Sequence, residues 1–140
     1  MDLSSIKISV LVIDDDHFTA KILSKICGRL DIKDVIVADN GFEGVALALK
    51  KKPTVIFCDI LMPEINGLQV LKMLKTIDIT NRIPVLMITG NPDYAYIKTA
   101  MAQGACDFVS KPFSFETIQE KLGKAIKESE DYICEAEFEV

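Results

Sequence analysis

The stretch ISVLVIDDDHF, residues 8–18, decides the expected fold, because it joins a continuous apolar run to three acids. The run over residues 8–13 is typical of a strand covered on both faces, as in a parallel sheet between layers of helices. Beyond the acids, apolar residues recur at every fourth position from Phe18 to Leu30, which predicts an amphipathic helix. This stretch therefore predicts a strand, an acidic turn and a helix in succession.

The same alternation of an apolar run and an amphipathic segment recurs along the rest of the chain. It predicts further strands at residues 35–38, 55–58, 85–88 and 106–109, and further helices at residues 42–50, 68–77, 94–102 and 115–127. Apolar strands that alternate with helices are typical of an α/β fold in which helices cover both faces of a doubly wound parallel sheet. We therefore expect five strand–helix units in one domain.

Residues that favour helix ends and turns stand at the expected boundaries. Asn40 and Asn91 are suited to cap the second and fourth helices, and Gly104 is suited to end the fourth. Pro53 and Pro84 precede the third and fourth strands, where the chain must turn.

Length and charge limit the domain organisation. A chain of 140 residues that is 49% hydrophobic and 26% charged is sufficient for one globular domain with its own core. The net charge of −5 is accounted for by residues 129–140, which contain five acids and no Lys or Arg. We expect a domain over residues 1–128 and a frayed acidic tail over residues 129–140. A domain without net charge has no electrostatic footprint for direct nucleic-acid binding.

The N-terminus and the cysteines argue against secreted and membrane proteins. Residues 1–10, MDLSSIKISV, lack the basic and apolar segments of a signal peptide, and no apolar run approaches the roughly 20 residues that span a bilayer. The four cysteines are widely spaced without a C-x-x-C pair, so they indicate neither a zinc site nor a disulfide framework. We expect a cytoplasmic protein with reduced thiols and no membrane contact.

Side chains that can bind ligands or react follow four of the five predicted strands. Three acids follow the first strand at residues 14–16, Asp59 follows the third, Thr89 the fourth and Lys111 the fifth. The carboxyl ends of parallel strands meet at one sheet edge, where ligands bind. An isolated acidic triplet would indicate only a polar turn with a helix cap, but carboxylates gathered at one edge repel one another unless a cation lies among them. Oxygen ligands of this kind suit Mg²⁺.

Asp59 in such a setting has the properties of a nucleophile toward phosphorus. A carboxylate can form an aspartyl phosphate when nearby cations, here Mg²⁺ and Lys111, neutralise the charge of the incoming phosphoryl group. Phosphoryl transfer depends mainly on positioning and on electrostatic stabilisation of the phosphoryl oxygens. The Thr89 hydroxyl, the Lys111 ammonium and backbone N–H groups are sufficient to stabilise the phosphoryl oxygens. The transfer needs no separate catalytic base.

Four segments resemble the motif regions of response-regulator receiver domains, which act in two-component signalling. They are VLVIDDDHF, FCDILMPEINGL, VLMITG and FVSKPF, in the order and spacing of the family, and the resemblance extends from about Ile6 to Lys127. It implies a flavodoxin-like fold with strand order 2-1-3-4-5. It also implies a signalling phosphoacceptor rather than an enzyme, which takes its phosphoryl group from a histidine kinase or a phosphotransfer protein and acts on an unknown output partner.

The resemblance further implies a set of site residues. Asp59 is the implied phosphoacceptor, Asp15 and Asp59 are direct Mg²⁺ ligands, Asp14 holds the metal through water, and the carbonyl of Leu61 adds a ligand. Thr89 and Lys111 correspond to the phosphoryl-binding hydroxyl and amine.

Other positions match family features outside the metal site. Phe108 corresponds to an aromatic residue that switches together with Thr89, and the Lys111–Pro112 peptide bond corresponds to one that is usually cis. Leu61 and Asn91 correspond to positions that tune hydrolysis of the phosphoryl group.

The sequence departs from the family pattern at two positions. Asn66 precedes Gly67 where Asp is commoner, but Asn also fits a left-handed turn, so we expect the loop after Asp59 to keep its shape. Gly90 stands after Thr89 where a small side chain is usual, so that loop is expected to be looser.

Three other functions share part of this pattern. A haloacid-dehalogenase-type phosphohydrolase also carries Asp-x-Asp after its first strand, as Asp14 and Asp16 do, but no acid pair follows Lys111. A flavodoxin-like FMN protein would need a neutral loop where the three acids stand. A degenerate receiver would bind partners without phosphorylation, although every residue needed for the chemistry is present.

Overall fold

The computed structural model describes residues 7–90 and 94–138, with the backbone alone over residues 130–138. Within these ranges, five parallel strands form one sheet in the order β2-β1-β3-β4-β5. The predicted fold class, parallel pairing and strand order are thereby confirmed. The strands are β1 (Ser9–Ile13), β2 (Asp34–Ala38), β3 (Val55–Asp59), β4 (Val85–Thr89) and β5 (Asp107–Ser110).

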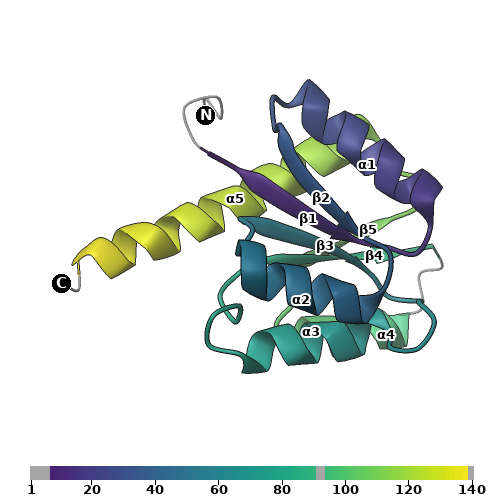
Figure 1. Cartoon of the computed structure of the whole chain (residues 1–140). Helices are drawn as coiled ribbons and strands as arrows, with labels where there is room; N and C mark the ends of the chain where they lie inside the picture. The colour runs from purple at the N-terminus through teal and green to yellow at the C-terminus, as the bar shows by residue number, and fades with distance from the viewer. Residues whose placement is uncertain (1–6, 91–93, 139–140) are drawn as a thin grey trace.

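Helices cover both faces of the sheet. Figure 1 shows α1 and α5 on one face and α2, α3 and α4 on the other. The helices are α1 (His17–Arg29), α2 (Gly41–Lys51), α3 (Gly67–Thr76), α4 (Tyr94–Ala102) and α5 (Phe115–Phe138). None of the helices in the described ranges combines the length and the apolar character that a membrane crossing requires.

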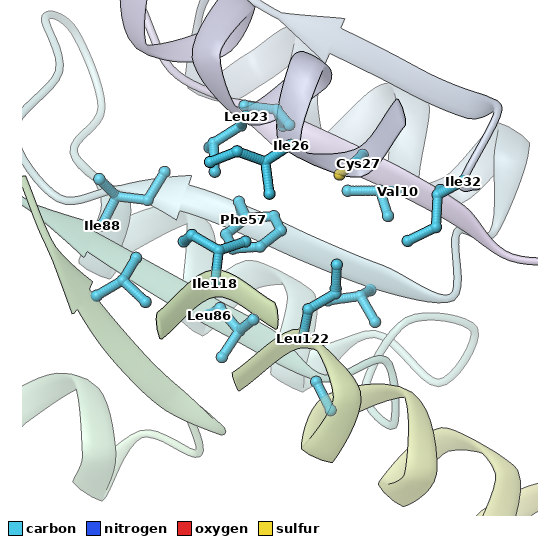
Figure 2. Packing of buried hydrophobic residues seen from close by; sticks show 14 of the residues in the cluster. Val10, Leu23, Ile26, Cys27, Ile32, Phe57, Leu86, Ile88, Ile118 and Leu122 are labelled. Carbon is cyan, nitrogen blue, oxygen red and sulfur yellow. The ribbon is translucent and has the colours of Figure 1, made fainter. Parts of the chain in front are cut away.

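The core consists of two apolar layers because successive strand residues point to opposite faces. Phe57 is fully buried on the α1 and α5 face, where Figure 2 shows it between Leu23 and Ile118. Its neighbours Ile56 and Cys58 belong to the layer under α2, α3 and α4. Burial on both faces explains why the central strands are continuously apolar.

The last helix is longer than predicted. We expected it to end at residue 127 with an acidic tail beyond, but α5 continues to Phe138 and projects past the sheet in Figure 1. Residues 128–138 contain neither Gly nor Pro, and four of them are Glu, a strong helix former. The prediction was wrong because it gave weight to the charge of this segment and ignored its helix propensity. Residues 139 and 140 lie outside the described ranges.

Asparagine side chains cap the N-termini of α2 and α3. Asn40 caps α2, as predicted, by accepting a hydrogen bond of 2.8 Å from the backbone N–H of Glu43. Asn66 caps α3 and forms a reciprocal capping box with Gln69. The left-handed turn expected at Asn66 is wrong, because its φ is −85° and Glu64 carries the positive φ in this loop. The cap predicted at Asn91 lies outside the described residues.

Gly67 allows this loop to pass directly behind the end of β3. Its backbone N–H donates a 2.7 Å hydrogen bond to the carbonyl of Ile60. A Cβ atom at this position would collide with the carbonyl oxygen of Asp59 and would lie 2.8 Å from Cα of Ile60. Because both obstacles are backbone atoms, no side-chain rotation would relieve the collision.

Gly67→Ala should therefore destabilise the protein by about 3 kcal/mol, the upper part of the range for overpacking. Gly123→Ala is the matched control, because Gly123 lies inside α5 and a Cβ atom there would meet nothing within 4 Å. That substitution should stabilise the protein by about 1 kcal/mol through helix propensity. Urea unfolding monitored by circular dichroism measures both changes, and a Gly67→Ala protein as stable as wild type would contradict the close approach.

Candidate functional site

The acids and the hydroxyl predicted from the strand ends meet at the carboxyl edge of the sheet. Asp14, Asp59 and Thr89 are almost completely buried, with exposed fractions of 0%, 6% and 6%, whereas Asp15 is exposed. The parallel register aligns these ends, because Cys58 pairs with Ile13, immediately before Asp14. The predicted convergence of Asp14, Asp15 and Asp59 is therefore present.

Lys111 brings a positive charge to the two buried acids. Its Nζ lies 3.5 Å from Oδ2 of Asp14 and 3.8 Å from Oδ2 of Asp59. The backbone N–H of Lys111 donates a 2.9 Å hydrogen bond to the carbonyl of Thr89, and the Lys111–Pro112 bond is cis, as expected. One ammonium therefore faces two carboxylates, and their charge is only partly balanced.

The three carboxylates form a donor set that fits a divalent cation. One oxygen from each of Asp14, Asp15 and Asp59 lies within 4.8 Å of the others. Oδ1 of Asp14 accepts a 2.9 Å hydrogen bond from the backbone N–H of Asp16, but the buried Oδ2 accepts none from the described residues. The Lys111 ammonium, 3.5 Å away, satisfies this buried oxygen only weakly, and a hard cation such as Mg²⁺ would complete its coordination. The role predicted for the Leu61 carbonyl stays a prediction.

Electrostatics at this edge favour a bound cation. Burial raises the pKa of Asp59 to about 7, and the charge of nearby Asp14 adds to this rise while Lys111 opposes it. Burial likewise raises the pKa of Asp14 above its usual range. Near neutral pH, ionising both acids is therefore costly in the metal-free protein, and a divalent cation would remove that cost.

Asp16 caps α1 and is not part of the cluster of Asp14, Asp15 and Asp59. Its Oδ1 accepts from the backbone N–H of Phe18 at 3.0 Å, and its Oδ2 accepts from the Thr19 hydroxyl at 2.8 Å. The hydrogen bond from Thr19 lowers the pKa of Asp16, so this side chain stays ionised as a cap. The haloacid-dehalogenase alternative needs the carboxylates of Asp14 and Asp16 at one site, but both oxygens of Asp16 accept hydrogen bonds in the cap of α1.

Cys58 and Phe108 are two further side chains near the site. Cys58 is fully buried, and burial raises the pKa of its thiol, so it is a core residue and not a reactive one. Phe108 is partly buried against the layer under α2, α3 and α4. The switching role implied for Phe108 remains a prediction. Gly67 also supports Asp59, a role that was not predicted, although the glycine stands in the loop that follows the acid in the sequence.

The chain belongs to the response regulator receiver domain family, whose family model matches residues 10–123. It is similar to the chemotaxis protein CheY1 of Helicobacter pylori, with 32% identity over 81% of this chain and 92% of that protein. It is also similar to the chemotaxis protein CheY of Listeria monocytogenes, with 32% identity over 86% of this chain and 99% of that protein.

Solved structures share the same architecture. The chemotaxis response regulator CheY4 of Vibrio cholerae superposes with a TM-score of 0.78 at 27% identity, over 84% of this chain and 98% of that one. NtrX of Brucella abortus has a TM-score of 0.84 at 22% identity, over 94% of this chain and 30% of that one, and this likeness concerns the fold alone. Receiver domains are signalling phosphoacceptors that use Mg²⁺ at an acidic pocket and interact with histidine kinases and output domains.

The raised pKa of Asp59 predicts how the stability of the metal-free protein depends on pH. Between the unfolded pKa of about 4 and the folded pKa of about 7, the folded state binds more protons, so its stability falls as pH rises. Asp59→Asn removes this titration. In EDTA, the variant should gain about 2 kcal/mol over wild type at pH 8 and much less at pH 5.

Thermal and urea unfolding at the two pH values measure this difference. Asp78→Asn is the control, because it also replaces an acid by its amide, but Asp78 is exposed in the turn after α3. Mg²⁺ at pH 8 should stabilise wild type more than Asp59→Asn. A stability difference that is the same at pH 5 and pH 8 would refute the buried-charge explanation.

Proposed function

We propose that this chain is a phosphoacceptor receiver domain of a two-component system, which accepts a phosphoryl group on Asp59 in a Mg²⁺-dependent reaction. The donor is the phosphohistidine of a histidine kinase or of a phosphotransfer protein. The observation that carries the proposal is the meeting of Asp14, Asp15 and Asp59 at one sheet edge, with the Lys111 ammonium 3.5 Å and 3.8 Å from the two buried acids.

Each residue of the site has a part in the proposed reaction. An Oδ atom of Asp59 forms a bond to phosphorus while the bond from phosphorus to the donor imidazole breaks, and the imidazole keeps the electron pair. Lys111 and the Thr89 hydroxyl stabilise the phosphoryl oxygens. Asp14, Asp15, Asp59 and the Leu61 carbonyl would hold Mg²⁺, which supplies positive charge against the phosphoryl oxygens.

The signal would leave the site through Thr89 and Phe108. Thr89 ends β4 and pairs in register with Ser110 of β5, and Phe108 lies two residues earlier on β5. A phosphoryl group on Asp59 would attract the Thr89 hydroxyl as a hydrogen-bond donor, which vacates space beside β4 for the Phe108 ring. The ring position would change the shape that β5 and its neighbouring helices present to an output partner, as a shift between populated states.

The degenerate-receiver alternative makes the opposite prediction about chemistry. Incubation with acetyl phosphate and Mg²⁺ should add one phosphoryl group to wild type, and Asp59→Asn should abolish the addition because it removes the nucleophile. Intact-mass spectrometry measures the added mass in wild type and in Asp59→Asn. As controls, EDTA should prevent phosphorylation of wild type, and Asp78→Asn should be phosphorylated normally. Undiminished phosphorylation of Asp59→Asn would show that Asp59 is not the acceptor. An unmodified wild type would favour the degenerate receiver.

The lifetime of the phosphorylated state should depend on Leu61. Its side chain is 60% exposed two residues after Asp59, and an apolar side chain cannot orient a water molecule for attack. Leu61→Asn and Leu61→Glu should speed dephosphorylation about fivefold, the effect of roughly one added hydrogen bond, with little change in Mg²⁺ affinity.

Decay of the phosphoprotein after removal of the donor measures this rate. Ile79→Asn is the matched control, because Ile79 is also an exposed aliphatic residue, at 57%, but lies in the turn after α3. Equal decay of wild type and both Leu61 variants would show that this position does not govern water access. Asn91, the other position implied in hydrolysis, lies outside the described residues.

A further inference from the structure

Lys121 of α5 makes three contacts with the segment of β5 that contains Phe108. Its Nζ donates a 2.6 Å hydrogen bond to the Phe108 carbonyl and a 3.1 Å hydrogen bond to Oδ1 of Asp107. The same ammonium lies 4.8 Å from the centroid of the Phe108 ring, within the range of a cation–π interaction. Since its side chain is only 23% exposed, these contacts are partly shielded from water.

These contacts join the two faces of the sheet around its edge. β5 is the outermost strand of the sheet, and no other described strand pairs with its outer side. Val109 belongs to the apolar layer under α1 and α5, whereas Phe108 packs against the layer under α2, α3 and α4. Lys121 lies on α5 and yet reaches the Phe108 ring, so its side chain extends from one face toward the other.

Asp107 completes this arrangement at the backbone of the edge strand. Its Oδ1 accepts a 2.8 Å hydrogen bond from the backbone N–H of Phe108 as well as the hydrogen bond from Lys121. The N–H and the carbonyl of Phe108 are therefore both bound by charged side chains. Charged residues of this kind shield an edge strand from pairing with another chain, but shielding the backbone does not require the cation to face the ring.

A pocket beside Phe108 leaves this residue incompletely packed. A pocket of about 280 Å³ lies between β5 and the start of α5, and its lining includes Phe108, Phe113, Thr117 and Lys121. Because Phe108 and Lys121 both line this pocket, the packing around Phe108 is incomplete on that side. The Lys121 ammonium is thus a specific attraction that favours the observed ring position.

We propose that Lys121 is a positioning residue that holds the Phe108 ring beside α5 and so sets how readily the ring responds to the state of the Asp59 site. The proposal deepens the proposed function and rests on it for the signalling consequence. A cation–π interaction at a partly exposed site corresponds to about a two- to fivefold bias between ring positions. Loss of this bias should let the ring leave its observed position before any phosphoryl group is bound.

The test compares Lys121→Met, which keeps much of the aliphatic stem but removes the charge, with Lys121→Arg, which keeps a cation able to bind a carbonyl and a ring face. Lys124→Met is the control, because Lys124 lies on the same helix and pairs with Glu120 at 3.3 Å. Three-bond couplings measured on Phe-labelled protein give the χ1 populations of Phe108 in the metal-free state. Chemical shifts on addition of Mg²⁺ and beryllofluoride give its response to an occupied site.

Lys121→Met should lower the population of the observed Phe108 rotamer two- to fivefold relative to the others, whereas Lys121→Arg and Lys124→Met should keep it. Beryllofluoride should then move the Phe108 signals less far in Lys121→Met, because part of the change has already occurred. Unchanged χ1 populations in Lys121→Met would overturn the proposal, even if its melting temperature fell, because a purely structural role predicts that result.

The two hypotheses fail in different ways. If wild type responds to neither beryllofluoride nor acetyl phosphate, the proposed function fails, while the rotamer populations of the metal-free protein still decide the role of Lys121. If wild type is phosphorylated normally and the populations do not respond to Lys121→Met, the positioning role alone is wrong. Should Lys121→Met fail to fold, Lys121→Gln removes the cation but keeps a donor for the carbonyl, and the same rotamer criterion applies.

Discussion

The repulsion between two buried carboxylates, Asp14 and Asp59, is the interaction on which the rest of this site depends. Their strands are neighbours at the centre of the sheet, so the fold forces the two acids together and removes them from water. Lys111 balances one negative charge at most. Burial, together with the charge of Asp14, therefore raises the pKa of Asp59 to about 7 although Lys111 opposes the rise. The protein thus folds with excess negative charge at this edge of the sheet, and a bound divalent cation would neutralise it.

The surrounding backbone holds the acids in place without taking part in their chemistry. Gly67 lets the loop after Asp59 lie against the end of its strand, and the capping box of Asn66 fixes the point at which α3 begins. Asp16 is adjacent to the acids in sequence, but its oxygens are occupied at the N-terminus of α1. These supports separate the acids that can bind a cation from the acid that stabilises a helix.

The edge strand β5 connects this buried centre with the molecular surface. Lys111 follows the strand and faces the acids, whereas Phe108, near its beginning, is bound by Lys121 from the last helix. A short strand with one neighbour can adjust more easily than the central strands, which are covered on both faces. The site and the surface are therefore linked through an element that is anchored at both ends by lysine side chains.

The sequence by itself determined the fold class, the approximate position of every strand and the meeting of Asp14, Asp15, Asp59 and Lys111 at one sheet edge, because apolar runs, helix periodicity and charged strand ends are local patterns. The same local reasoning failed at α5, where charge was given more weight than helix propensity, and at Asn66, where a cap was taken for a turn. Only the tertiary structure decided that Asp16 caps a helix instead of joining the acidic cluster, that a buried oxygen of Asp14 accepts no hydrogen bond from the described residues, and that Lys121 reaches Phe108. These features depend on distances between residues that are brought together by packing, and no pattern along the chain encodes such distances directly.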